Sequence, residues 1–447
     1  MIINREKAIT IPVLLILWLG GFVSDSVIPL VLVAMTLVSI RLIVLYRNVQ
    51  TVFIFYIFHL SFILMLIPYF MFDIPITPHS EFQIAIYMNP ALLIHGAFVF
   101  ALYLFTDLNI PNRPIVFSKN LPKRGDAAVF LLLTGIMMAI LVNMMVGKVN
   151  VYSLPADQAW GTYVKNIDPT VVGSGAPEYF LVFFLTAFIF GKKLYLRGIL
   201  IGIFCIFIYS GFTRGMRVSF LMLILLFFAL FFDGKIKLRY ILLMTLVGMT
   251  LLHAAGYAKS GKRDVVDLFS VYSGTQLLTN QGEVFYTSNV VVSSITDGIC
   301  GLKERAFSLL AASLQVIIPP RIGLGNEGKP FLYVRELTGR AAGGGGLISV
   351  FFYFWMDYFG VVLIAFFLAK VTNKAIKKPT SLLSIYIICV YSLYPRWLVY
   401  DPVNFLFRVP LYAICLYLLL MEFHRMMLKH KLTRNITQEC KALPWAM

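Results

Sequence analysis

Residues 194–234, LYLRGILIGIFCIFIYSGFTRGMRVSFLMLILLFFALFFDG, show the pattern that decides the fold. Two apolar runs flank a short polar motif, SGFTRGMR, at residues 210–217. A helix rises about 1.5 Å per residue, and about 20 residues cross the hydrocarbon core of a bilayer. The 41 residues of this stretch are therefore too many for one crossing and suit two. The stretch predicts two membrane-spanning helices joined by a tight turn.

The composition of the whole chain agrees with that interpretation. Of 447 residues, 60% are hydrophobic and 13% are charged, whereas a soluble domain carries about 25% charged residues. So few charges do not cover a water-facing surface, and the apolar runs predict an all-α polytopic membrane protein with about 12 transmembrane helices. The predicted spans are residues 8–24, 27–46, 50–72, 84–106, 127–146, 176–191, 194–212, 216–234, 239–257, 346–369, 380–398 and 402–423.

The basic residues support this topology. The net charge of +17 indicates basic cytoplasmic loops rather than a nucleic-acid partner. Seven alternate segments carry 23 of the 38 Lys and Arg residues, and twelve spans bring all seven to one side. The segments hold Arg5 and Lys7; Arg41 and Arg47; Arg113, Lys119, Lys123 and Arg124; Lys192, Lys193 and Arg197; Lys235, Lys237 and Arg239; Lys370, Lys374, Lys377 and Lys378; and five residues between Arg425 and Lys441. Both termini are therefore expected in the cytoplasm.

The organisation along the chain has three parts. Residues 1–257 hold the first nine predicted spans, and residues 346–447 hold the last three and a cytoplasmic tail. Between them, residues 258–345 are predicted as a large external loop, and loops of that length are usually functional. The apolar run 306–318 within this loop is expected to lie along the membrane surface.

The arginines of the opening motif point to an anion site. Arg214 and Arg217 fall on the outer side, and only fifteen uncharged residues separate Arg217 from Asp233. Arg217 is therefore expected at or inside the membrane boundary, where an arginine is costly without a partner or a cavity. A helix beginning by Thr213 places both guanidinium groups on one face, suited to the paired oxygens of a diphosphate. The alternative is two arginines that extend to the headgroups.

Other external residues could complete such a site. The motif YPRWLVYD places Arg396 and Asp401 at the outer turn between the last two spans, and Arg408 either pairs with Asp401 or binds ligand. The motif IIPPRIGLGNEGKP, residues 317–330, supplies Arg321 and Lys329. Further along lie Arg335, the carboxylates Glu336 and Asp357, and the glycines 343–346, which favour a sharp turn into the tenth span or a close approach to a ligand.

Several chemistries find no support. The five cysteines form no CxxC pair, and the first external loop, SDSV, has one acidic residue, Asp25, where metal-dependent membrane glycosyltransferases carry two. No nucleotide-binding or metalloprotease motif occurs, so neither a metal nor a cofactor is expected. No histidine lies between residues 253 and 424, which excludes a catalytic histidine in the long loop.

In its organisation and in three motifs the chain resembles the O-antigen polymerases, the Wzy family of oligosaccharide repeat-unit polymerases. The motifs are SGFTRGMR, IIPPRIGLGNEGKP and GGGGLISVFFYFWMDYFGVV. Members often carry an acidic residue early in the tenth span, whereas Asp357 comes late here. The resemblance implies a GT-C-like fold in the bacterial inner membrane, with the active site facing the periplasm.

The resemblance also implies a metal-independent glycosyltransferase. It would move a glycan chain from undecaprenyl diphosphate to the non-reducing end of a second undecaprenyl-diphosphate-linked repeat unit, beside membrane lipid and a chain-length regulator protein. Positioned cations can stabilise a diphosphate leaving group. The residues expected in that role are Arg214, Arg217, Arg321, Lys329, Arg335 and Arg396, with Glu336 or Asp401 as the general base.

Two other classes remain open. A flippase for lipid-linked oligosaccharides binds the same headgroup, but it is expected to show two related halves and cations deep in several spans. An O-antigen ligase resembles the polymerases in architecture, but that family uses a histidine in the large outer loop. A small-solute permease has no need of an 88-residue outer loop.

Overall fold

The computed structural model describes residues 5–72, 88–122, 125–146, 150, 154, 158, 176–214, 217–245, 247–248, 275–318, 325–339 and 345–442. Within these residues the chain is helical, with no β-strand. Eight of the described helices are long and apolar enough to cross a membrane. Large apolar side chains cover their outer faces, including Ile16, which is 68% exposed, and Leu37, which is 62% exposed. This is the architecture of a polytopic membrane protein.

The eight candidate spans follow the predicted pattern closely. They are α1 (Arg5–Val23), α2 (Ile28–Leu45) with the short helix before it, α3 (Gln50–Leu64) with α4 (Ile67–Phe72), α5 (Met88–Phe105), α6 (Ala127–Met145), α9 (Leu194–Thr213), α16 (Ile348–Lys377), and η6 (Val403–Arg408) with the first part of α19 (Val409–Ala442). The number twelve stays a prediction, and the spans overlap eight of the twelve expected segments.

Three more predicted segments form shorter helices. These are α8 (Ala176–Phe190), α10 (Arg217–Phe231) and α17 (Ser381–Ser392), and the apolar part of each is under 18 residues. Of the remaining segment, 239–257, residues 239–245 and 247–248 are described and are helical, and the rest lie outside the described residues. Asp126 caps α6 by accepting from the amides of Ala128 and Val129, and Thr380 caps α17 through the amide of Leu383. Both caps satisfy amides that a first helical turn leaves free.

The basic segments lie together at one end of the bundle, here called the basic end. Side-chain contacts join connections that are far apart in sequence. The joining pairs are Glu6–Arg41, Arg47–Asn112, Asp107–Lys377, Asn120–Ser381, Gln50–Ile236 and Asp126–His424, and the amide of Asp126 donates to the carbonyl of Phe190 at 3.3 Å. The described parts of the seven basic segments are therefore on one side, as the alternation of charges predicts.

The centre of the fold is the packing of α16 along α5. Helix α5 is buried along most of its length, and α1, α2 and α13 also contact it. A polar chain crosses this core: His59 Nε2 lies 3.2 Å from His95 Nε2, and His95 Nδ1 lies 3.1 Å from the hydroxyl of Ser349. Buried polar groups of this kind join α3, α5 and α16 because lipid offers them no alternative partner.

Helix α16 is broken in its first half. Met356 and Asp357 leave helical geometry, and Asp357 adopts a φ of 51°. The break frees backbone carbonyls, and Arg305 satisfies them: its guanidinium donates to the oxygens of Tyr353 and Phe354 and forms an ion pair of 2.6 Å with Asp357. Asp357 thus has a structural partner, although its side chain is 57% exposed.

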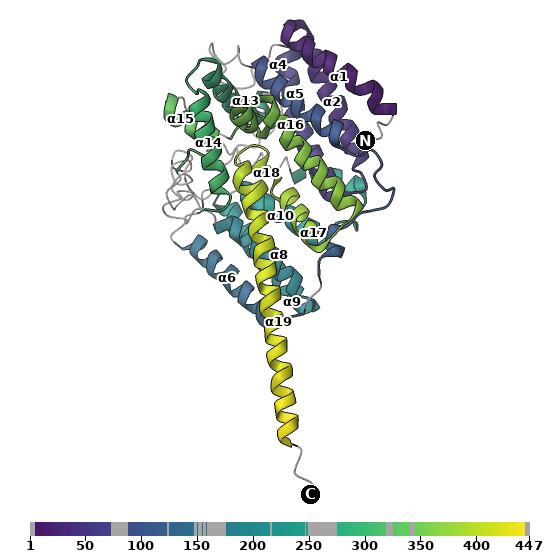
Figure 1. The fold of residues 1–447 in the computed structure, drawn as a ribbon, viewed down its shortest axis with the longest axis vertical. Coiled ribbons are helices and arrows are strands. Elements are labelled where there is room, and N and C mark those ends of the chain that lie inside the picture. The colour runs from purple at the N-terminus through teal and green to yellow at the C-terminus, as the bar shows by residue number, and fades with distance from the viewer. Residues whose placement is uncertain are drawn as a thin grey trace.

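The segment predicted as a long external loop contains three helices in its described parts. They are α13 (Thr275–Thr296), α14 (Leu302–Gln315) and α15 (Pro330–Thr338). Figure 1 shows them gathered on the left of the molecule, away from the N-terminus on the right. Hydropathy did not predict helix α13 because many of its buried residues are polar, although apolar residues such as Phe285 and Val291 are buried beside them. The buried polar residues are Thr287, Ser288, Asn289, Ser293 and Ser294.

Helix α14 carries its large apolar side chains outward. Phe307, Leu310 and Ile317 beyond its end are exposed, whereas Ser308 and Ala312 face the protein. An outward apolar face beside spanning helices is typical of a helix in contact with lipid. The arrangement fits the expectation that residues 306–318 lie at the membrane surface.

The Arg305 contacts predict a stability defect. Arg305→Ala should lower the free energy of unfolding by about 2–3 kcal/mol, because the carbonyls at the break and the Asp357 carboxylate lose their donor. Arg305→Lys should recover only part of this loss, because one ammonium group does not reproduce the guanidinium fork. Titration of the protein with SDS in mixed micelles measures both. Lys303→Ala, which removes an exposed cation from the same helix, is the control, and an equal loss there would contradict the assignment.

Candidate functional site

The end of the bundle opposite the basic end holds the turn between α17 and α19. This turn consists of α18 (Tyr394–Trp397) and the π-helical η6. The backbone ties its two charged residues together, because the amides of Tyr400 and Asp401 donate to the carbonyl of Arg396 at 2.8 and 3.0 Å. One carboxylate oxygen of Asp401 also accepts from the amide of Asn404 at 3.0 Å. Arg396 and Asp401 are thus held close by the turn itself.

Asp401 forms an ion pair with a residue that is distant in sequence. The ammonium of Lys329 lies 3.0 Å from Oδ2 of Asp401, and the side chains are 25% and 9% exposed. Pairing with Asp401 was one of the two interpretations of Arg408, and Arg408 instead has other partners. Its guanidinium donates to Asn404 at 2.8 Å and to the carbonyl of Gln315 at 3.1 Å, because the π-helical turn rotates it toward α14.

Arg396 lies over two aromatic rings. Its guanidinium carbon is 5.2 Å from the ring centre of Tyr400 and 5.9 Å from that of Phe405. The Nε atom is buried and has no hydrogen-bond partner among the described residues. A buried donor without an acceptor is costly, so this N–H is available to an anionic group that enters the site.

Glu178, in the first turn of α8, belongs to the same cluster. Its Oε2 is buried without a hydrogen-bond partner in the described part of the chain. It lies close enough to interact electrostatically with Arg396, Asp401 and Lys329. The sequence analysis missed this residue, although a lone carboxylate that opens an apolar span was a signal for it. Glu178, Lys329, Arg396 and Asp401 are called the charge cluster below.

The inner face of α14 positions Lys329 in the cluster. The hydroxyl of Ser308 accepts from the indole of Trp355 at 3.0 Å and donates to the carbonyl of Glu327 at 2.6 Å. The amide of Gln315 donates to the carbonyl of Gly325 at 3.0 Å. These bonds hold residues 325–329 against α14, which Arg305 in turn fastens to α16. The contacts with α14 therefore position Lys329 next to Asp401.

Gly345, in the glycine run 343–346, allows a close approach between two backbone segments. A β-carbon at this position would overlap the carbonyl oxygen of Val399 and the backbone of Tyr400. The amide of Ile348 then donates to the carbonyl of Leu398 at 2.8 Å. The close approach is therefore to the turn that carries Arg396 and Asp401. Residues 343 and 344 lie outside the described residues.

Arg214 is buried at the end of α9, on the side away from the basic end. It is 6% exposed, and its Nη1 has no hydrogen-bond partner among the described residues. The hydroxyl of Ser210, one turn earlier in the same helix, is likewise buried without a described partner. The expectation of one helix carrying both arginines is wrong, because α9 ends at Thr213 and α10 begins at Arg217. The side chain of Arg217 lies outside what the structure describes.

The other predicted site residues are not drawn into the charge cluster. Arg335 and Glu336 are exposed on α15, and Glu336 accepts from the side-chain amide of Asn326 at 2.6 Å. Arg321 lies outside the described residues. The cluster thus combines three predicted residues, Lys329, Arg396 and Asp401, with the unpredicted Glu178.

Within the residues described, no group of three or more His, Cys, Asp or Glu side chains could hold a metal ion. No protein family, curated protein or solved structure matches this chain. The charge cluster itself offers two cations for an anionic ligand and two carboxylates for proton transfer. The four side chains come from three separate parts of the chain, because Arg396 and Asp401 share one turn.

The Lys329–Asp401 pair is expected to be energetically coupled. A double-mutant cycle with Lys329→Met and Asp401→Asn should give a coupling of about 1–2 kcal/mol, because both partners are partly shielded from water. The same cycle on the exposed pair Arg425–Glu422 (3.1 Å apart) should give about 0.3–0.5 kcal/mol. Unfolding free energies in mixed micelles provide both values. Equal couplings would show that the cluster is no more shielded than the surface.

Proposed function

We propose that this protein is a polymerase of lipid-linked oligosaccharide repeat units. It transfers a glycan chain from undecaprenyl diphosphate to the non-reducing end of a second lipid-linked repeat unit. The observation that carries the proposal is the buried, unpartnered Nε of Arg396 beside the carboxylates Glu178 and Asp401. A cationic donor next to a carboxylate is the combination that a diphosphate leaving group and an attacking hydroxyl require.

The reaction balances without a further reactant. The acceptor hydroxyl oxygen forms a bond to the anomeric carbon of the donor, and the bond between that carbon and the diphosphate oxygen breaks. The hydroxyl proton passes to a carboxylate, and undecaprenyl diphosphate leaves with its negative charge. No redox change occurs.

The cations have distinct parts in this scheme. Arg396 donates to the diphosphate as its charge grows, and Arg214 supplies a second buried guanidinium at the same end of the bundle. Lys329 pairs with Asp401 at 3.0 Å and so positions that carboxylate in the site. Arg217, Arg321 and Arg335 remain proposed contributors to phosphate binding.

Asp401 and Glu178 are the proposed bases. Both lie within the charge cluster, whereas Glu336, the first expectation, is exposed and bonded to Asn326. Glu336 would need movement of α15 to reach the diphosphate site. We therefore rank it behind the two cluster carboxylates.

The orientation follows from the charges. Positive residues favour the cytoplasmic side, so the basic end is assigned to the cytoplasm and the charge cluster to the periplasmic face of a bacterial inner membrane. A GT-C-like arrangement with twelve spans, and a partnership with a chain-length regulator, belong to the same proposal. Flippase and ligase remain the alternatives.

Deletion of the gene tests the activity class. A polymerase defect should leave single repeat units attached to the lipid core, because flipping and ligation continue without polymerisation. Separation of the surface glycan by length on a gel makes this visible. Loss of every repeat unit would contradict a polymerase and favour the flippase or ligase.

Substitutions in the cluster test the site. Arg396→Lys should lower the transfer rate about 10²-fold, the typical effect of removing one positioned donor. Arg214→Lys, Arg217→Lys and Glu178→Gln should also shorten the glycan more than they lower the protein level. Arg239→Lys, at the basic end, is the matched control and should keep normal chain length. Normal chains in the Arg396 variant would remove this residue from the site.

A further inference from the structure

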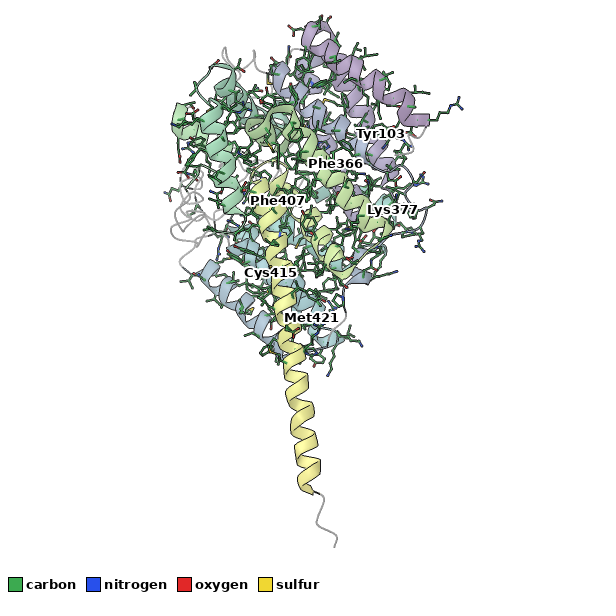
Figure 2. All side chains as sticks on the ribbon, in the orientation of Figure 1. Tyr103, Phe366, Lys377, Phe407, Cys415 and Met421 are labelled. Atoms are coloured by element: carbon green, nitrogen blue, oxygen red, sulfur yellow. The ribbon has the colours of Figure 1, made fainter. Side chains whose placement is uncertain are left out.

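A cavity lies at the basic end of the protein, opposite the charge cluster. It has a volume of about 500 Å³ and is lined by the ends of α1, α5 and α16. Its polar lining residues are Lys7, Thr106, Asp107, Asn109, Lys370, Asn373, Lys374 and Lys377. Figure 2 labels Lys377 and Tyr103 on the right of the molecule, toward the N-terminus in Figure 1.

Hydrogen bonds between helix ends hold the walls of this cavity. Lys7 is buried, and its ammonium donates to the carbonyls of Leu104, at 2.7 Å, and of Thr106. Asn373 donates to the carbonyl of Phe105 at 2.9 Å and accepts from the amide of Asp107 at 3.1 Å. These bonds join the ends of α1, α5 and α16 and so fix the walls of the cavity.

The cavity carries excess positive charge. Four lysines line it, and the one lining carboxylate, Asp107, pairs with Lys377. Lys7 and Lys370 are close enough to repel each other electrostatically. Lys370 and Lys374 are exposed at the rim and have no carboxylate partner among the described residues. An anion that enters the cavity would relieve this repulsion.

Apolar surface adjoins the rim along α16. Tyr358, Val362, Phe366 and Lys370 follow one another at four-residue spacing and so share a face of the helix. Val362 is 38% and Phe366 39% exposed, and the Lys370 ammonium lies 5.5 Å from the ring centre of Phe366. The charged cavity therefore continues into an exposed apolar strip on a candidate span.

From these features we propose that the cavity binds the phosphate headgroup of an anionic phospholipid. The phosphate lies among Lys370, Lys374 and Lys7, and an acyl chain lies along Val362 and Phe366. A basic cavity between helices at a membrane boundary suits such a headgroup. The shared chemistry is a phosphate anion, and the apolar strip favours its lipid source over free phosphate.

Binding of defined lipids to the purified full-length protein tests this site. Native mass spectrometry in detergent would compare dioleoyl phosphatidylglycerol with dioleoyl phosphatidylcholine and with inorganic phosphate. The wild-type protein should prefer phosphatidylglycerol. The double variant Lys370→Gln/Lys374→Gln should weaken that binding about 25-fold, because each lysine near an anionic lipid contributes about five-fold.

The controls separate the cavity from general charge. Lys192→Gln/Lys193→Gln removes two exposed charges at the same end, outside the cavity, and should leave the affinity within about two-fold. Lys370→Arg/Lys374→Arg keeps the charge and should retain binding. Equal weakening by the Lys192/Lys193 variant, equal affinity for the two lipids, or displacement of the lipid by inorganic phosphate would each overturn the proposal.

Discussion

The contact of Arg305 with the break in α16 supports much of the rest of the structure. A bilayer offers no water to backbone carbonyls that a broken helix leaves free. Arg305 donates to two of these carbonyls and pairs with Asp357. This requirement draws α14 against α16, and the inner face of α14 then holds the segment that carries Lys329. A backbone constraint in one helix thus determines where a cation of the charge cluster lies, about 24 residues further along the chain.

The two ends of the bundle use their scarce charges differently. At the basic end, ion pairs and hydrogen bonds join connections distant in sequence, such as Glu6 with Arg41 and Asp107 with Lys377. At the other end, Arg396 and Glu178 keep buried polar atoms without described partners. Buried atoms without described partners also occur toward the basic end, at Arg197 and Asp233. The proposed glycosyl transfer therefore rests on the grouping of two cations and two carboxylates in one cluster, and the proposed lipid binding rests on the four lysines that line the cavity.

The limits of prediction differ from element to element. Hydropathy located the turn between α9 and α10 because lipid selects unbroken apolar runs. It overlooked α13, whose buried Ser, Thr and Asn side chains face protein instead of lipid. The sequence predicted that Arg396 and Asp401 lie together, because both residues belong to one short connection. The sequence did not predict the ion pair of Asp401 with Lys329, because Lys329 lies 72 residues away in sequence and is positioned by contacts with α14.

The amino-acid sequence by itself determined that this protein lies in lipid. It also determined the positions of most apolar helices and the side on which the basic segments lie. These properties depend on the local composition of about 20 residues at a time. The tertiary structure alone decided that Arg214 and Arg217 belong to separate helices, that Glu178 joins Arg396, and that four lysines line one cavity. Such contacts combine residues from several helices, and their geometry depends on packing that no single segment encodes.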